Sequence, residues 1–331
     1  MKLNRKMTPA RQRRLDSTFA PAAAAIARQL DGGAFHMDAS STIHLGRQLE
    51  ELDTELYFVE YPESAGVNIL PIKANINAGA DTYTYQSRDR VGDFAPVANW
   101  ADDSPNQDVA GDSDTSKLHS FRGHYAYSVQ DMRRSQMAGT GIENDRAMAA
   151  RENAETKLDE TLAVGYSPLN ITGFFNNASV SAVTPDTGSW DLAGTDADEI
   201  VADLNKAVRT VITGSKGRVV PNAIVMAPTA FAAAETKRLQ NTDISALDFF
   251  RKKNPGVTIS QWARAETAGA AGVRRLMVGR MDRRTLEGLV PVRFETFPPE
   301  LRGLVYRVEC HVRTGGTLFR YPGAWRYMDN C

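Results

Sequence analysis

A long, uninterrupted helical pattern in the middle of the chain most constrains its fold. The stretch IENDRAMAARENAETKLDETLAVG, from Ile142 to Gly165, contains no proline and carries an apolar stripe at helical spacing. The stripe consists of Ala147, Ala150, Ala154, Leu158 and Leu162. A helix of this length is a rod of roughly 33 Å. Because much of the stripe is alanine, we expect this helix to pack closely along a neighbouring element.

The segment after the helix predicts a sharp turn. Gly165 is a natural C-terminal cap, and a proline three residues later prevents the helix from restarting. The sequence GYSPLNITGFFNNASV could be read as the mouth of a pocket, because it places two phenylalanines beside two asparagines. We instead interpret it as a structural turn whose aromatic rings anchor it against a sheet. The residues assigned to this turn are Gly165, Pro168, Gly173, Phe174 and Phe175.

Length and composition exclude several classes of protein. The 331 residues suit two linked subdomains, or one domain with large excursions. An apolar fraction of 42%, a charged fraction of 24% and a formal charge of −1 are those of a soluble globular protein without a strong global field. The two cysteines, Cys310 and Cys331, cannot form a disulfide framework. No apolar run is long enough to span a bilayer, so we expect no membrane partner.

An acidic segment without a base lies between two strand patterns, 82–85 and 116–129. Its carboxylates are Asp102, Asp103, Asp108, Asp112 and Asp114. The spacing of an EF-hand calcium loop is absent, so we interpret them as solvated or as meeting bases on another subunit. A long hairpin buries no core of its own and needs cover from elsewhere. The candidate bases are Arg251, Lys252 and Lys253, or Arg274 and Arg275.

The N-terminus, MKLNRKMTPARQRR, is a basic arm without an acid. It is either a solvated tail, or it binds phosphate or a neighbouring chain. From 43 to 59, apolar residues recur at mostly three- to four-residue steps and predict a helical arm closed by Pro62.

The second half of the chain alternates helix and strand, which predicts a mixed α/β unit. The segment DADEIVADLNKAVRTVITGSKG is an amphipathic helix, and strand-like runs follow at 219–226, 257–262, 275–278 and 290–296. A shorter helix over 246–253 has Asp243 or Ser245 as its N-cap. Two further strands flank Gly315 and Gly316 near the end of the chain.

No pattern in the sequence supports catalysis. The five histidines, at 36, 44, 119, 124 and 311, occur without HExxH or CxxC. GSKG at 214–217 does not complete a phosphate loop, and GTG at 139–141 lacks the third glycine of a dinucleotide fingerprint. Cys310 lies in an alternating strand, where a buried structural thiol is the default. We therefore expect no enzyme, no cofactor and no bound metal.

The order of these parts resembles one family, the major capsid proteins of tailed double-stranded-DNA bacteriophages, whose fold is shared with encapsulin shells. The long helix running into LNITGFFNN is similar to the spine helix and following turn of that family. VRTGGTLFRYPGA, from Val312 to Ala324, is similar to its closing peripheral-domain strand.

The resemblance implies an α+β fold, the tailed-phage major capsid fold. Its parts would be an N-terminal arm (1–66), an extended β-hairpin loop with its peripheral strands (67–129), a peripheral domain (130–194) with the spine helix at 142–165, an axial α/β domain (195–303), and closing peripheral strands (304–331).

The implied function is structural: pentamers and hexamers of an icosahedral head that encloses DNA, located in the virion and assembled in the host cytoplasm. Implied partners are other copies, a portal protein, possible scaffolding and decoration proteins, and packaged DNA. The chain shows no long N-terminal scaffolding segment, so we expect separate scaffolding or none. The arm bases expected to face the lumen are Arg5, Lys6, Arg11, Arg13 and Arg14.

Two alternatives remain at this stage. An encapsulin shell would have the same fold but a cargo-binding lumen, and the basic arm favours the phage. A soluble α/β enzyme is the alternative of another class.

Overall fold

The computed structural model describes residues 64–96, 105–139 and 142–331. The chain divides into a unit of residues 1–61 and a unit of residues 62–331, and all described residues belong to the second. The basic arm, the predicted helix over 43–59, and Asp102 and Asp103 lie outside the described residues.

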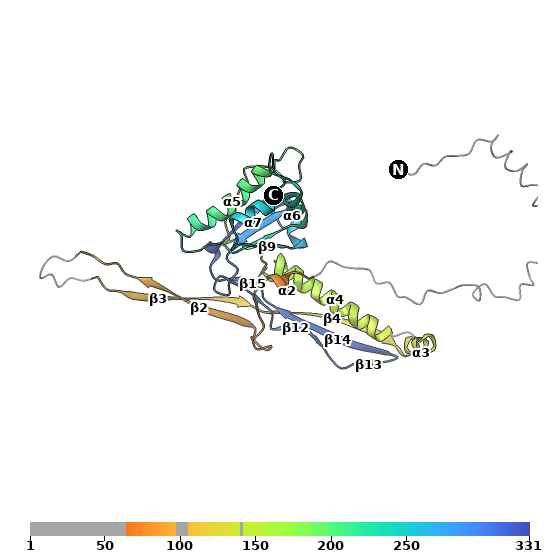
Figure 1. The fold of residues 1–331 in the computed structure, drawn as a ribbon. Coiled ribbons are helices and arrows are strands. Elements are labelled where there is room, and N and C mark those ends of the chain that lie inside the picture. Colours follow the sequence, from red (N-terminus) through yellow and green to blue (C-terminus); the bar gives the residue numbers. More distant parts are fainter. Residues whose placement is uncertain (1–63, 97–104, 140–141) are drawn as a thin grey trace, which may run out of the picture. The chain divides into compact units, whose positions relative to one another are not determined.

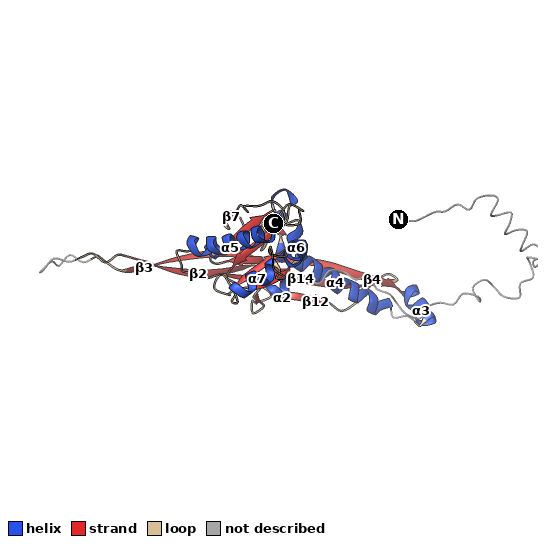
Figure 2. Ribbon diagram, turned by 45° about the horizontal axis from the view of Figure 1, so that its top comes forward, coloured by secondary structure: helices blue, strands red, loops and turns tan. Residues whose placement is uncertain are grey.

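The predicted long helix is confirmed as α4, Ile142–Ala163, which ends just before Gly165 (Figure 1). Leu158 and Leu162 of the predicted stripe are fully buried. On another face, Arg151 and Glu155 form the expected pair one turn apart, at 3.3 Å. The helix lies along strands of a four-stranded sheet, which we call the peripheral sheet (Figure 2).

The peripheral sheet is built around one long strand, β14. The partners β12 and β13 share one edge of β14, while β4 pairs antiparallel with it along the full length of the other edge. A capping box on Ser128 and Asp131 begins α3, directly after β4. The elements of this part are β4 (His119–Ser128), α3 (Val129–Ala138), β12 (Val292–Thr296), β13 (Glu300–Arg302) and β14 (Val305–Thr314).

A small central sheet, in the order β1-β11-β15, connects the parts of the unit. β1 pairs parallel with β11, and β11 pairs antiparallel with β15. The two-stranded β5–β6 sheet contacts β15. The elements here are α2 (Gly66–Ile69), β1 (Ile72–Lys73), β5 (Gly165–Tyr166), the 3-10 turn η2 (Ser167–Leu169), β6 (Ile171–Thr172), β11 (Leu286–Leu289) and β15 (Gly316–Phe319).

The hairpin is an antiparallel ribbon of β2 (Thr82–Val91) and β3 (Asp108–Lys117). The strand pattern at 82–85 is confirmed in β2, but the prediction for the second strand is wrong: β3 lies largely in the acidic segment that was placed between the strands, and most of the 116–129 pattern forms β4 of the peripheral sheet. Because β3 is exposed on both faces, its sequence carries no apolar alternation. Its register runs from Thr82 opposite Lys117 to Val91 opposite Asp108. Neither strand pairs with any other strand of the described chain, and in Figure 1 the ribbon extends away from the sheets of its own unit.

The predicted α/β unit contains a five-stranded mixed sheet in the order β7-β16-β10-β8-β9. A capping box of Asp196 and Glu199 begins α5, whose apolar face is buried. Ser245, one of the two predicted candidates, is the N-cap of α7. The elements are β7 (Ala182–Val183), α5 (Ala197–Gly214), β8 (Ala223–Met226), α6 (Pro228–Thr236), α7 (Ala246–Lys253), β9 (Thr258–Gln261), the 3-10 turns η3 (Ala263–Glu266) and η4 (Ala270–Gly272), β10 (Arg275–Gly279), the 3-10 turn η5 (Pro322–Ala324) and β16 (Trp325–Asp329).

The last strand differs from the sequence assignment, which grouped all of 304–331 with the peripheral strands. β16 instead pairs antiparallel with β10 over five residues, from Arg275 opposite Asp329 to Gly279 opposite Trp325. The reason is burial: Trp325, Tyr327 and Met328 are almost completely buried in the core that includes the α/β sheet.

The GFFNN turn connects the end of α4 to the α/β sheet. The backbone amides of Phe174 and Phe175 donate to the carbonyls of Leu162 and Ala163, each at 2.8 Å, and so satisfy acceptors that a helix end leaves unpaired. Gly165 has a φ of +83°, and a side chain on it would strike the backbone of residues 171–173. The turn therefore closes tightly against the helix that it follows.

Both phenylalanine rings are fully buried in an aromatic cluster. The Phe174 ring lies with its centroid 4.9 Å from Phe175, 5.7 Å from Trp262 and 5.4 Å from Trp325. The hydroxyl of Tyr327 donates to the carbonyl of Phe174 at 2.9 Å, and burial raises the pKa of Tyr327 to about 12. The cluster joins the helix end, the turn and strand β16.

Replacement of Phe174 by alanine should destabilise the subunit by about 3–5 kcal/mol, because it opens a cavity among fully buried rings. Phe297→Ala is the control, since Phe297 is 46% exposed. Chemical denaturation of the unassembled subunit measures both changes. A loss for Phe174→Ala no greater than that of the control would show that the ring is not an anchor.

Candidate assembly interface

Among the described residues, contacts to the rest of the unit hold the ribbon at one end, residues 78–85, which we call its foot. Arg313 on β14 donates to the carbonyls of Ala78 and Ala80 at 2.8 and 2.7 Å, and to the carboxylate of Asp81 at 2.8 Å. Its side chain is only 13% exposed. One buried guanidinium therefore fixes the three residues that lead into β2.

A second basic contact holds the first residues of the ribbon. The hydroxyl of Tyr83 accepts hydrogen bonds from Lys73 at 2.9 Å and from Arg320 at 3.2 Å. Burial acts to raise the pKa of Tyr83, but these two cations outweigh it and hold the pKa below its ordinary value. Arg320 also pairs with the buried Glu287 at 2.6 Å, which ties the contact to the central sheet.

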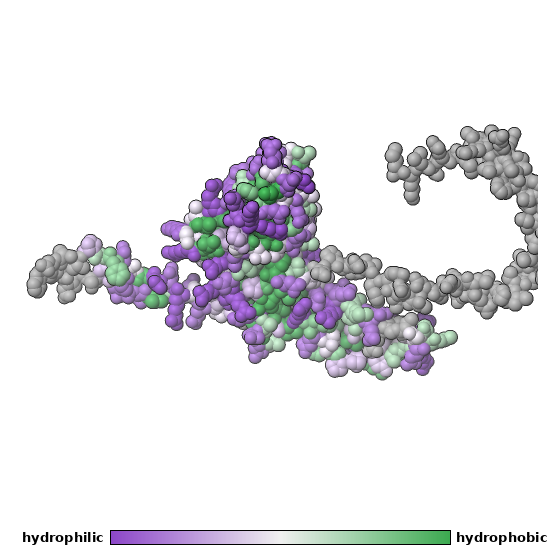
Figure 3. Space-filling view, viewed as in Figure 1, coloured by the Kyte–Doolittle hydropathy of each residue, from purple (hydrophilic) through white to green (hydrophobic). Residues whose placement is uncertain are grey.

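Beyond its foot, the ribbon is exposed on both faces. Three of the predicted acids, Asp108, Asp112 and Asp114, lie in the described residues, and each accepts a hydrogen bond from the backbone amide of the next residue. None of the three forms an ion pair with a base in the described part of the chain. Figure 3 shows hydrophilic residues along the ribbon, interrupted by apolar ones, and Phe94 beyond β2 is 88% exposed.

The first set of predicted bases lies at the end of α7. Arg251, Lys252 and Lys253 are exposed there. Two of them also contact aromatic rings of their own chain: Arg251 lies 5.6 Å from the ring centre of Phe231, and Lys253 lies 5.6 Å from that of Phe249. These bases remain accessible to a partner.

The alternative bases, Arg274 and Arg275, already pair with carboxylates of their own chain, which favours the first set as partners of the ribbon. Arg275 forms a two-point pair with Asp329 at 2.5 and 2.7 Å, and its side chain is only 12% exposed. Arg274 donates to both Ser189 and Asp191 at 2.7 Å. Their sequence positions gave no sign of these partners, which come from distant segments.

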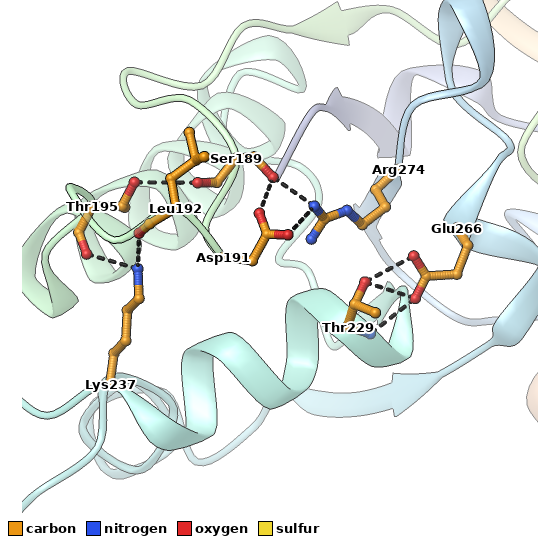
Figure 4. Close-up of polar contacts among 8 residues, drawn as sticks. All are labelled: Ser189, Asp191, Leu192, Thr195, Thr229, Lys237, Glu266 and Arg274. Carbon is orange, nitrogen blue, oxygen red and sulfur yellow. Dashed lines mark hydrogen bonds and ion pairs between the residues drawn. The ribbon is translucent and has the colours of Figure 1, made fainter. Parts of the chain in front are cut away.

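The contacts of Arg274 belong to a network that fixes the loop before α5 (Figure 4). Hydrogen bonds from Ser189 and Arg274 lower the pKa of Asp191. At the other end of the loop, the Lys237 ammonium donates to the carbonyls of Leu192 and Thr195 at 2.7 and 2.8 Å. Nearby, Glu266 accepts from the amide and hydroxyl of Thr229, as Figure 4 also shows. These polar groups serve to hold the loop and helix ends in place.

Residues 64–96, 105–139 and 142–331 contain no group of three or more His, Cys, Asp or Glu residues placed to hold a metal. Among these same residues, no helix has the length and apolarity needed to cross a membrane. Cys310 is buried, and burial raises the pKa of its thiol, as expected for a structural residue.

Comparison with known proteins decides the family. The family model for the major capsid protein matches residues 93–331. The chain belongs to the major capsid protein family. No curated protein matches its sequence.

Solved capsids share the fold of this major capsid protein. The capsid of Myoviridae phage XM1 is 18% identical with a TM-score of 0.79, over 88% of this chain and 100% of that chain. The capsid of the native GTA particle is 13% identical with a TM-score of 0.62, over 90% and 99%. The virus-like particle from Pyrococcus furiosus is 14% identical with a TM-score of 0.52, over 79% and 91%.

The family confirms the predicted α+β capsid fold and a structural role in a virion shell. A capsid protein associates with other copies of itself. The encapsulin and enzyme alternatives are not favoured, because the family model that matches is that of the viral protein.

Sequence reasoning missed a buried carboxylate that organises this major capsid protein. Asp159 on α4 is 5% exposed and accepts hydrogen bonds from the Gly66 amide at 2.9 Å and the Trp262 indole at 3.0 Å. Arg264 donates to its other oxygen at 3.2 Å. Asp159 thus ties α4 to α2 and to the α/β unit, and the acid in its helical pattern gave no sign of burial.

Replacement of Arg313 by alanine should loosen the ribbon, because it removes the three contacts at the foot. We expect a stability loss of about 1–3 kcal/mol and faster limited proteolysis within 74–91. Arg302→Ala is the matched control on the same sheet, since Arg302 is 62% exposed and pairs only with Glu300. Equal digestion rates for the two variants would contradict the anchoring role.

Proposed function

We propose that this major capsid protein assembles as pentamers and hexamers of an icosahedral phage head that encloses double-stranded DNA. The observation that carries the proposal is the ribbon, whose two ten-residue strands are anchored at one end and exposed on both faces. A two-stranded ribbon is marginal in water and needs a further surface to cover it. Other copies of the chain supply that surface repeatedly and by symmetry.

The acidic residues between 102 and 114 contact bases on a neighbouring copy. The sequence prediction names the carboxylates Asp102, Asp103, Asp108, Asp112 and Asp114, with the α7 residues Arg251, Lys252 and Lys253 as the first candidates for their partners. Exposed pairs of this kind set the register of docking more than its affinity. The contact should therefore weaken as salt increases.

The N-terminal arm contacts packaged DNA or the next subunit through Arg5, Lys6, Arg11, Arg13 and Arg14. Cationic side chains bind the phosphate backbone without reading sequence. A portal protein completes the head, scaffolding or decoration proteins are further partners, and assembly takes place in the host cytoplasm. The protein acts without catalysis of its own.

Electron microscopy of the purified protein tests this function. We expect closed, hollow particles with five- and six-fold clusters of subunits. In particles from infected cells, we also expect a portal and DNA. Particles filled with a protein cargo instead of DNA would support an encapsulin, and a monomer or small oligomer at all concentrations would contradict a shell function.

Deletion of residues 1–14 tests the role of the arm. Removal of its six bases should reduce DNA retention or particle yield. The reduction should be larger at low salt, because high salt already screens the contacts between the bases and phosphate. Substitution of the same bases by glutamine is the control for length. Unchanged yield and unchanged DNA retention in both variants would show that the arm has neither role.

A further inference from the structure

The ribbon segregates its charges by face. In an antiparallel pair, residues directly opposite each other project to the same side, so the register assigns every side chain to a face. One face carries four acids and no base, namely Asp89 on β2 and Asp108, Asp112 and Asp114 on β3. We call this the acidic face. The contact between Tyr85 and Asp114, at 3.5 Å, confirms that these opposite residues share it.

The other face has the reverse composition. It carries three bases and no acid, namely Arg88, Arg90 and Lys117. Thr84 and Thr115 share this face, and their hydroxyls meet at 2.8 Å. A solvated ribbon has no need to separate its charges, so the two faces are suited to two different surfaces.

A basic surface of matching kind lies on two adjacent turns elsewhere in the unit. One turn follows α5 and contains Lys216 and Arg218, and the other joins β10 to β11 and contains Arg280, Arg283 and Arg284. All five are exposed. We call them the basic turns.

Backbone and side-chain contacts hold the two turns together. Asn222, which follows the first turn, exchanges hydrogen bonds with the backbone of Met281 in the second, at 2.6 and 3.4 Å. The backbone amide of Asn222 also donates to the carbonyl of Gly279 at 3.0 Å. The second turn is fixed further by Arg320, which donates to the carbonyl of Arg283.

The charges of the basic turns are not neutralised by their own chain. Across the described ranges, Lys216, Arg218, Arg283 and Arg284 take part in no ion pair, and Arg280 has only a loose contact of 3.9 Å with Asp282. Five bases and one acid on these two linked turns leave a net positive charge, which an anionic partner would stabilise.

We propose that the acidic face of the ribbon of one copy docks on the basic turns of a second copy. This inference rests on the proposed shell function and names the surface that receives the ribbon. Four acids that lack a base on their face meet five bases that have only Asp282 among them. Each exposed ion pair contributes little to the binding free energy, but the set of pairs together fixes how the ribbon aligns with the turns. The shell repeats this contact in every subunit.

The basic turns match the ribbon better than the end of α7. Two of the three α7 bases already lie over aromatic rings, and Arg251 also lies 3.9 Å from Asp248. The basic turns carry more charge and are rigidly held. The test therefore includes both surfaces.

Charge-swap variants of the full-length protein test the proposal. The ribbon variant combines Asp89→Lys, Asp108→Lys and Asp112→Lys, and keeps Asp114 because Tyr85 contacts it. The turn variant combines Arg218→Glu, Arg283→Glu and Arg284→Glu. All six positions are exposed, so the subunits should fold, which circular dichroism and thermal unfolding verify. Particle yield is measured by sedimentation and electron microscopy.

Each triple variant should lower particle yield about tenfold or more at physiological salt, and their combination should recover yield to within about threefold of the original. The matched controls combine the ribbon variant with Arg251→Glu, Lys252→Glu and Lys253→Glu, or the turn variant with Arg88→Glu and Arg90→Glu. Neither control should restore assembly.

Three results would overturn the proposal. The first is a six-site variant that assembles no better than either triple variant, and the second is rescue through the α7 residues. The third is a turn variant with full particle yield but reduced DNA content, which would make the basic turns a phosphate-binding surface. Assembly of the unmodified protein is scored separately, so failed rescue leaves the shell function standing.

Discussion

Two backbone hydrogen bonds, from Phe174 and Phe175 to the last carbonyls of α4, hold the rest of the structure in place. They reverse the chain within a few residues and place both rings in the core between the helix end and strand β16. Because the rings are fully buried, the helix end and the α/β sheet share one core. Asp159 adds a polar contact on another side of the same helix.

The stability of the unit is concentrated in that core, and the ribbon contributes little to it. Only the foot is held, by Arg313 and by the cations around Tyr83. The rest of the ribbon makes cross-strand contacts alone, which are marginal in water. A rigid body with an anchored but uncovered extension suits a subunit whose remaining contacts come from other copies.

The sequence allowed prediction of elements whose pattern is local. The α4 periodicity, the alternation at 82–85 and the Ser245 cap all depend on residues near one another in the chain, and each is confirmed. The sheet that β16 joins could not be predicted, because alternation of apolar residues along a strand does not show which sheet buries them. For the same reason, the partners of Arg274 and Arg275 were missed.

The candidate interface was predictable in part. The acids were evident from composition, but the separation of charge between two faces needed the register of β2 on β3. The basic turns lie more than sixty residues apart in the chain, and only the fold joins them, through the contact between Asn222 and Met281.

Hydrogen–deuterium exchange of the free subunit and of the assembled particle tests the central claim most directly. The account predicts that the amides of β2 and β3 exchange quickly in the free subunit and become strongly protected on assembly, while those of Phe174 and Phe175 are protected in both states. Equal exchange of the ribbon in the two states would contradict the claim that other copies cover it.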